Sequence, residues 1–74
     1  MNLTPQEEQL RKCLERVTQD SIWGVGIHQA LAANDEERFR GLIAQLRSQE
    51  KDSPQIMRNI LSDHCYEALV NYQS

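Results

Sequence analysis

Asp63, His64 and Cys65 stand next to one another, and such residue types supply the acid, base and nucleophile of many enzymes. Consecutive residues of a helix point about 100° apart, so three neighbours on one helix cannot form a hydrogen-bonded relay. A working thiolate also needs a base that the fold brings from elsewhere in the chain. We therefore interpret His64 and Cys65 as residues on the apolar side of a helix and expect no catalytic residues.

The soft metal ligands of the chain are Cys13, His28, His64 and Cys65, and they are scattered over three segments. No two of them have the close paired spacing that tetrahedral zinc sites use. The glycines at 24–26 resemble a fragment of a phosphate loop, but the third glycine and the lysine of that loop are missing. We interpret them as a flexible joint. The sequence predicts no metal site and no cofactor-binding site.

Two cysteines are too few for a disulfide scaffold. Cys13 and Cys65 both fall on faces that we expect to turn inward, so a disulfide that closes a long loop is an alternative. The amino terminus carries glutamates and no apolar stretch of secretory type, and no segment is apolar enough to span a membrane. These features favour a cytoplasmic protein with two free thiols of ordinary reactivity.

Helix start signals mark the elements that carry these residues. Thr4 and Glu7 have the spacing of a capping box, Asn34 precedes three acids, and Ser53 precedes a proline. Together with the spacing of the apolar residues, these signals predict helices over about 5–18, 27–33, 35–49 and 54–71. We expect an irregular start around 21–26 and a polar connection at 50–52.

The 74 residues are enough for one domain, residues 1–74. The fold class that we predict is all-α, a compact three- to four-helix bundle. Its core is expected to contain the residues that follow the helical period within each segment: Leu10, Leu14, Val17, Leu31, Phe39, Leu42, Ile43, Leu46, Ile60, Leu61 and Leu69.

The apolar stripe of residues 56–72 is wider than one neighbouring helix would cover. A core of this size supplies only about 3–5 kcal/mol, so a partner chain would add needed stability. Symmetric dimers are the commonest assemblies, and we expect a homodimer or a complex with another protein. The partner-binding residues that we predict are Trp23, Met57, Leu61 and Tyr72, with Trp23 either a core lid or an exposed anchor.

The net charge of −3 opposes sequence-independent binding to nucleic acid or to an anionic membrane. The function that we predict is therefore a non-enzymatic helical interaction module: an adaptor, inhibitor or regulator that docks to a protein. The alternative is a DNA-binding regulator with a helix-turn-helix over residues 27–49. Its recognition helix would begin with Asp35, Glu36 and Glu37, which repel phosphates, after a junction at Asn34 that looks short.

Overall fold

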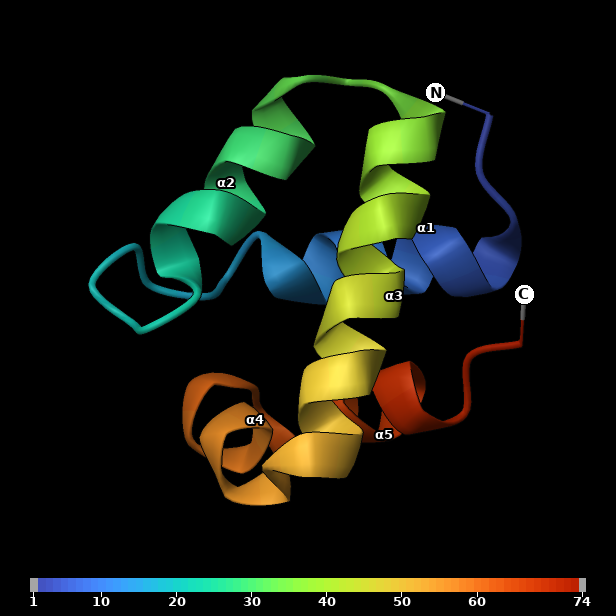
Figure 1. The fold of residues 1–74 in the computed structure, drawn as a ribbon. Coiled ribbons are helices and arrows are strands. Elements are labelled where there is room, and N and C mark those ends of the chain that lie inside the picture. Colours follow the sequence, from blue (N-terminus) through green and yellow to red (C-terminus); the bar gives the residue numbers. More distant parts are fainter. Residues whose placement is uncertain (1, 74) are drawn as a thin grey trace.

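Helices dominate the computed structural model, which describes residues 2–73 (Figure 1). Within this range α3 contacts α2, α4 and α5, and α1 packs against α5 and α2. No strand occurs among these residues, so the all-α prediction is confirmed, with five helices in place of the expected three or four. The five are α1 (Pro5–Leu14), α2 (Gly24–Ala32), α3 (Glu36–Asp52), α4 (Pro54–Ile60) and α5 (Asp63–Val70).

The first helix begins where its capping box predicts. The Glu7 N–H donates to Thr4 Oγ1 over 3.2 Å, and the Thr4 N–H donates to Glu7 Oε1 over 2.9 Å. The helix ends at Leu14 and not at residue 18, because the chain tightens into a turn in which the Val17 N–H donates to the Leu14 carbonyl over 3.1 Å. The His28 ring of α2 hydrogen-bonds the Val17 carbonyl and holds this turn in place.

The second helix begins at Gly24, three residues before the predicted start. A Cβ atom at Gly24 would lie 2.2 Å from the Thr18 carbonyl oxygen, which is far inside van der Waals contact. The glycine therefore allows the loop before the helix to cross directly against the helix start. The interpretation of this stretch as a flexible joint is wrong, because Gly24 serves close packing.

A three-residue turn, residues 33–35, joins α2 to α3. Asn34 has a φ of 54°, in the left-handed region that asparagine tolerates better than most residues. The cap of α3 is Asp35, whose side chain accepts from the Glu37 N–H over 3.0 Å. The turn is thus longer than the sequence suggested and has the length found in helix-turn-helix motifs.

The single helix predicted over 54–71 is two helices. Leu61 adopts an extended conformation, and the side chain of Ser62 caps α5 by accepting from the Cys65 N–H over 3.2 Å. In contrast, α3 continues to Asp52, so only Ser53 separates it from α4. The break at Leu61 turns α5 back along α1 (Figure 1).

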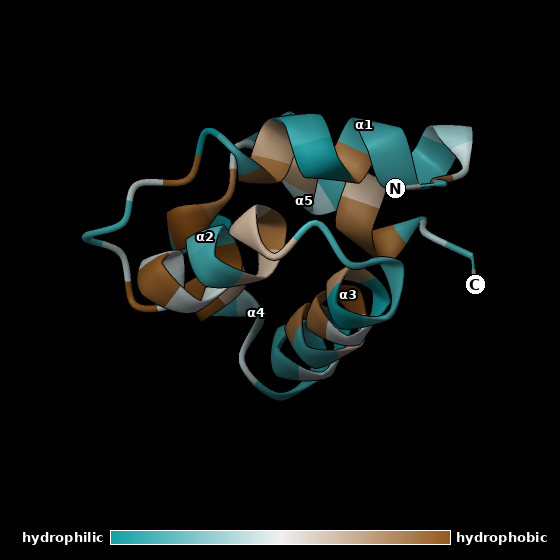
Figure 2. Cartoon of the chain, turned by 90° about the horizontal axis from the view of Figure 1, so that it is seen from above, coloured by the Kyte–Doolittle hydropathy of each residue, from teal (hydrophilic) through white to brown (hydrophobic). Residues whose placement is uncertain are grey.

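Ten of the eleven expected core residues are buried, and Ile60 is partly buried against them. Figure 2 shows that α1 carries its hydrophilic residues on the side away from α5. The stripe of residues 56–72 is covered from within, because α4 packs on α3 while α5 packs on α1 and α3. Its width therefore no longer argues for a second chain. The core also includes Ile27, Ala30, Met57, Cys65 and Tyr72.

Glu7 is the one charged residue buried among residues 2–73, with 2% of its surface exposed. Its carboxylate accepts from Arg40 Nε over 2.8 Å, from a second Arg40 nitrogen over 3.1 Å, and from the Tyr72 hydroxyl over 2.7 Å. The Arg40 hydrogen bonds lower the pKa of Glu7 to about 2, with help from Tyr72 and Thr4 and against the effect of burial. This network joins the start of α1 to α3 and to Tyr72, two residues beyond the end of α5.

The free energy of unfolding should fall as the pH drops from about 5 to about 2. In the unfolded chain the Glu7 pKa returns to about 4.5, so its lowered folded value stabilises the fold above that pH and not below about 2. The shift corresponds to about 3 kcal/mol. Urea midpoints measured by circular dichroism at pH 3 and pH 7 would test this.

Glu7→Gln should be less stable at pH 7 and should lose most of the pH dependence. Glu8→Gln is the matched control, because Glu8 is the exposed neighbour on the same helix. An equal pH dependence in Glu7→Gln and the wild type would contradict the assigned role.

Candidate functional site

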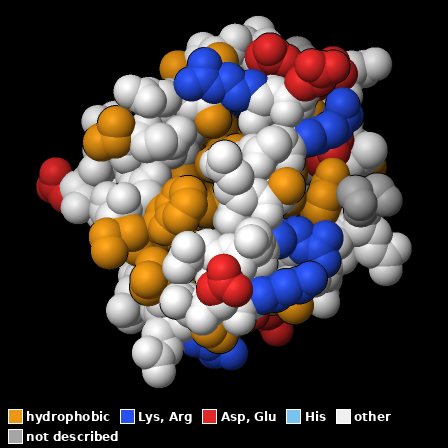
Figure 3. Space-filling view, viewed as in Figure 1, with side chains coloured by type: hydrophobic (Ala, Val, Ile, Leu, Met, Phe, Trp, Pro, Cys, Tyr) orange, Lys and Arg blue, Asp and Glu red, His pale blue; other side chains and the backbone are white. Residues whose placement is uncertain are grey.

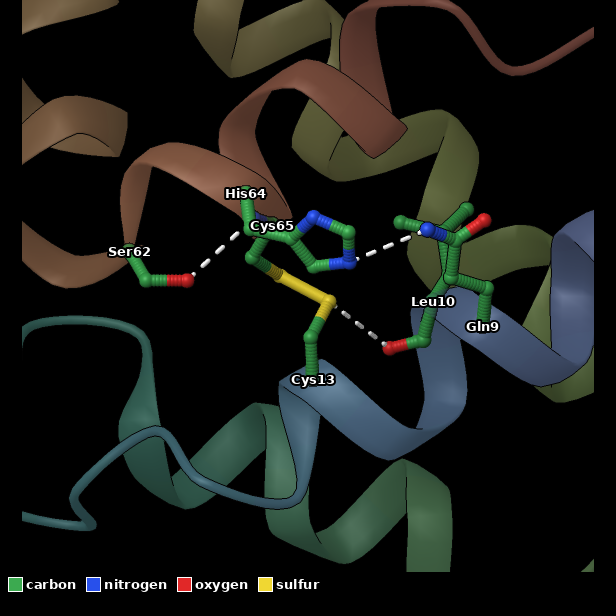
Figure 4. The surroundings of a disulfide bond; sticks show 6 residues. All are labelled: Gln9, Leu10, Cys13, Ser62, His64 and Cys65. Carbon is green, nitrogen blue, oxygen red and sulfur yellow. Dashed lines mark hydrogen bonds between the residues drawn. A yellow bond between two sulfur atoms is a disulfide. The ribbon is translucent and has the colours of Figure 1, made fainter.

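The two cysteines form a disulfide that joins α1 to α5 (Figure 4). The Cα atoms of Cys13 and Cys65 lie 5.6 Å apart, although 52 positions separate them in the sequence. The prediction of two free thiols is wrong, because the break before Ser62 turns α5 along α1 and brings the two sulfurs together. Disulfides persist mainly in oxidising compartments, so the cysteine count no longer supports a reducing location.

The Asp63–Cys65 triplet has no catalytic geometry. Cys65 is bonded to Cys13 and has no thiol, and the His64 ring pairs with the side-chain amide of Gln9 over 3.0 Å. The predicted helix over 54–71 would place Cys65 in the middle of a helix. In the structure, Cys65 is instead the third residue of α5. Across residues 2–73, no group of three or more His, Cys, Asp or Glu side chains is placed to hold a metal ion.

Three of the four predicted partner-binding residues lie in the core. Met57 is fully buried, and Leu61 and Tyr72 are 5% and 7% exposed, so none of them presents a docking surface. Their apolar character is explained by packing within the chain, and their burial does not support their assignment to a partner. Only Trp23 remains in place for such a role: it is partly buried against the core, and it lines a groove.

This groove runs between α2 and α3, which form a hairpin, with α2 rising and α3 descending in Figure 1. It has a volume of about 380 Å³. Its walls combine small or apolar residues with amides and a single guanidinium group, and we call it the α2–α3 groove. Its lining residues are Trp23, Gly26, Gln29, Ala30, Arg38, Gly41, Leu42 and Gln45.

Two glycines leave the α2–α3 groove open. A Cβ atom added at Gly26 or at Gly41 would meet nothing within 4 Å, so neither glycine is required by internal packing. Ile22 and Val25, which flank Trp23 and Gly24 in the chain, are 77% and 56% exposed. Figure 3 shows hydrophobic side chains gathered on the left of the view, on the side of α2.

The arginine side chains of α3 differ in their interaction partners. Arg40 is committed to Glu7 and Glu36, and the Arg47 guanidinium lies 5.9 Å from the centre of the Tyr72 ring. Arg38, in contrast, is exposed in the groove and makes no ion pair with another described residue. The groove thus offers one uncommitted positive charge beside amides that can donate and accept hydrogen bonds.

No family model, curated protein or solved structure matches this chain. Its function must therefore be inferred from its own residues. The predicted partner-binding residues include Trp23 but not Gly26, Arg38 or Gly41. A signal for the two glycines was present, because glycine within a helix costs about 1 kcal/mol and calls for a reason. In the part of the chain that the structure describes, no helix is long and apolar enough to cross a membrane.

Alanine substitutions should separate the three glycines by their surroundings. Gly26→Ala and Gly41→Ala should each raise the free energy of unfolding by about 0.5–1 kcal/mol, because the added methyl group meets open space in a helix. Gly24→Ala should lower it by about 1–3 kcal/mol, because its methyl group would meet the backbone of Thr18 and Gln19. Urea denaturation of the three variants would show the signs, and a stabilising Gly24→Ala would contradict the close-packing role.

Proposed function

We propose that this protein is a non-enzymatic interaction module that binds a helix of a partner protein in the α2–α3 groove. The observation that carries the proposal is the groove itself: an open surface lined by small residues, the indole of Trp23 and an uncommitted arginine. Its lining contains no carboxylate, thiol or imidazole to act as a base or nucleophile. Its chemistry suits binding and not catalysis.

The small residues support a helical occupant. Gly26 and Ala30 on α2 and Gly41 on α3 line the same groove, and residues without large side chains let another backbone approach closely. Ala44 and Ser48 continue the small side chains along the exposed side of α3. A third helix laid between α2 and α3 would bury Trp23, the type of residue that dominates binding energy at interfaces.

The charge of the groove defines the occupant further. Arg38 has no carboxylate partner among residues 2–73, so a glutamate or aspartate on the incoming helix would give it one. A guanidinium group can bind a carboxylate through two parallel hydrogen bonds, which fixes register as well as affinity. The partner that we propose is therefore an amphipathic helix whose apolar face includes an acidic residue.

A helix-turn-helix reader of DNA is the second candidate. The three-residue turn with a left-handed Asn34 favours it, because this turn length is usual for the motif. The charges oppose it. Asp35, Glu36 and Glu37 stand at the start of α3, where a recognition helix meets the bases, and Arg40 is held by Glu7. Docking to protein is the better supported function.

Filling the groove should abolish docking. The tagged protein would be crosslinked in its own cells to recover a partner, and binding would be titrated by the fluorescence of Trp23, the sole tryptophan. Gly41→Gln and Arg38→Glu should each weaken binding at least tenfold. Ala32→Gln is the matched control, because Ala32 is exposed on α2 and does not line the groove.

Light scattering at high micromolar concentration distinguishes a second copy of the chain from a different protein. A dimer that Gly41→Gln dissociates would identify the occupant as the chain itself. Partner binding that survives both groove substitutions and leaves Trp23 fluorescence unchanged would refute the groove as the docking site.

Specific binding to duplex DNA is not expected at physiological salt. The net charge is negative, and three carboxylates open the candidate recognition helix. A mobility-shift assay on genomic fragments at about 150 mM salt would test this. A sequence-dependent shift that Arg38→Ala weakens would overturn the docking proposal and favour the DNA reader.

A further inference from the structure

The disulfide lies beside a second cavity, which shares no lining residue with the α2–α3 groove. This cavity has a volume of about 180 Å³, and we call it the disulfide cavity. Cys13 is partly exposed and lines it, whereas Cys65 is 1% exposed and does not. A molecule that enters the disulfide cavity therefore meets the sulfur of Cys13. The remaining lining residues are Gln9, Lys12, Arg16 and His64.

The disulfide cavity is positively charged on a protein of net charge −3. Lys12 and Arg16 are both exposed, and neither makes an ion pair with another described residue. His64 of α5 and the side-chain amide of Gln9 of α1 pair with each other over 3.0 Å and add hydrogen-bonding groups to the cavity (Figure 4). No carboxylate lines the cavity. It therefore attracts a small anion to the edge of the disulfide.

We propose that the Cys13–Cys65 disulfide is a site of thiol–disulfide exchange with small thiols that carry carboxylate groups. Lys12 and Arg16 bind the carboxylate, and the thiolate of the same molecule attacks Cys13 Sγ. The volume of the cavity suits a small molecule and not a protein loop. This inference is independent of the α2–α3 groove and of any partner bound there.

The exchange has two steps that balance. In the first, the incoming thiolate forms a bond to Cys13 Sγ, the Cys13–Cys65 bond breaks, and Cys65 leaves as a thiolate that takes up a proton. In the second, another thiolate attacks the sulfur of the bound thiol, releases a small-molecule disulfide and leaves Cys13 reduced. The two thiols that are consumed supply both electrons and both protons.

The surroundings of each sulfur fit its role. Cys65 is the third residue of α5, and the amino-terminal turn of a helix stabilises a leaving thiolate. Cys13 Sγ lies 3.3 Å from the Leu10 carbonyl oxygen, which can accept a hydrogen bond from the Cys13 thiol after reduction (Figure 4). Reduction removes the covalent link between α1 and α5 and leaves their packing to hold them.

The test compares three small thiols that differ in charge: 3-mercaptopropionate, 2-mercaptoethanol and 2-aminoethanethiol. Intact-mass analysis of the folded protein first establishes the disulfide. The rate of its opening is then measured for each thiol at low salt and divided by the thiolate concentration. We expect the anionic thiol to react roughly tenfold faster than the neutral one, and the cationic thiol to be slowest, with the differences shrinking as salt is added.

A double variant with Lys12→Gln and Arg16→Gln should make the three rates nearly equal. The control is Lys51→Gln, because Lys51 is exposed near the end of α3, and it should leave the order of the rates unchanged. Circular dichroism checks that each variant is folded. Acid quenching and peptide mapping should find the first adduct on Cys13, with Cys65 free. The proposal would be overturned if the wild-type rates did not depend on the charge of the thiol, or if the first adduct formed on Cys65. Two free thiols in the purified protein would also overturn it.

Discussion

A carboxylate that is removed from water must be matched by donors on every side, and this requirement at Glu7 holds the fold together. The donors come from Thr4 before α1, from Arg40 in the first half of α3 and from Tyr72 after α5. Loss of any one of them leaves a buried charge without full compensation. The other end of α1 is fixed by its disulfide to α5. The first helix is therefore held at both ends by interactions with distant parts of the chain.

Neither of these two constraints involves α2. The core side of α2 is anchored by Ile27 and by the contact of His28 with the Val17 carbonyl, while its other side borders the α2–α3 groove. The disulfide cavity lies between α1 and α5 and shares none of the groove's lining residues. The molecule thus separates a surface suited to a partner helix from a surface suited to small anions, although its net charge is negative.

Local chemistry in the sequence was enough to predict the helical class, the start of α1 and ten of the fifteen buried core residues. Thr4 and Glu7 are three residues apart, so their pairing needs no information about the rest of the fold. The errors arose where contacts between distant parts of the chain determine the local structure. Nothing near Gly24 in the sequence shows that the Thr18 backbone crosses it. The apolar stripe of residues 56–72 suggested one long helix, whereas the chain breaks at Leu61 and starts a new helix after Ser62. Because of that error, neither the disulfide nor the burial of Tyr72 was predicted. Arg38 could be recognised as an arginine without an ion-pair partner only after the partners of Arg40 were known.

The Glu7 network has a topological consequence for the chain. Asn2 accepts from Arg40 through its carbonyl, and the Gln73 N–H donates to the side chain of Gln6, so both ends of the described chain meet at the start of α1. Residues 2 and 73 therefore both lie beside the first turn of α1, which contains Glu7. A circularly permuted chain, with residues 2 and 73 joined by a short linker and new ends placed at Ser53, would keep every helix intact. The order in which the helices are synthesised would change, but the set of contacts that defines the fold would not.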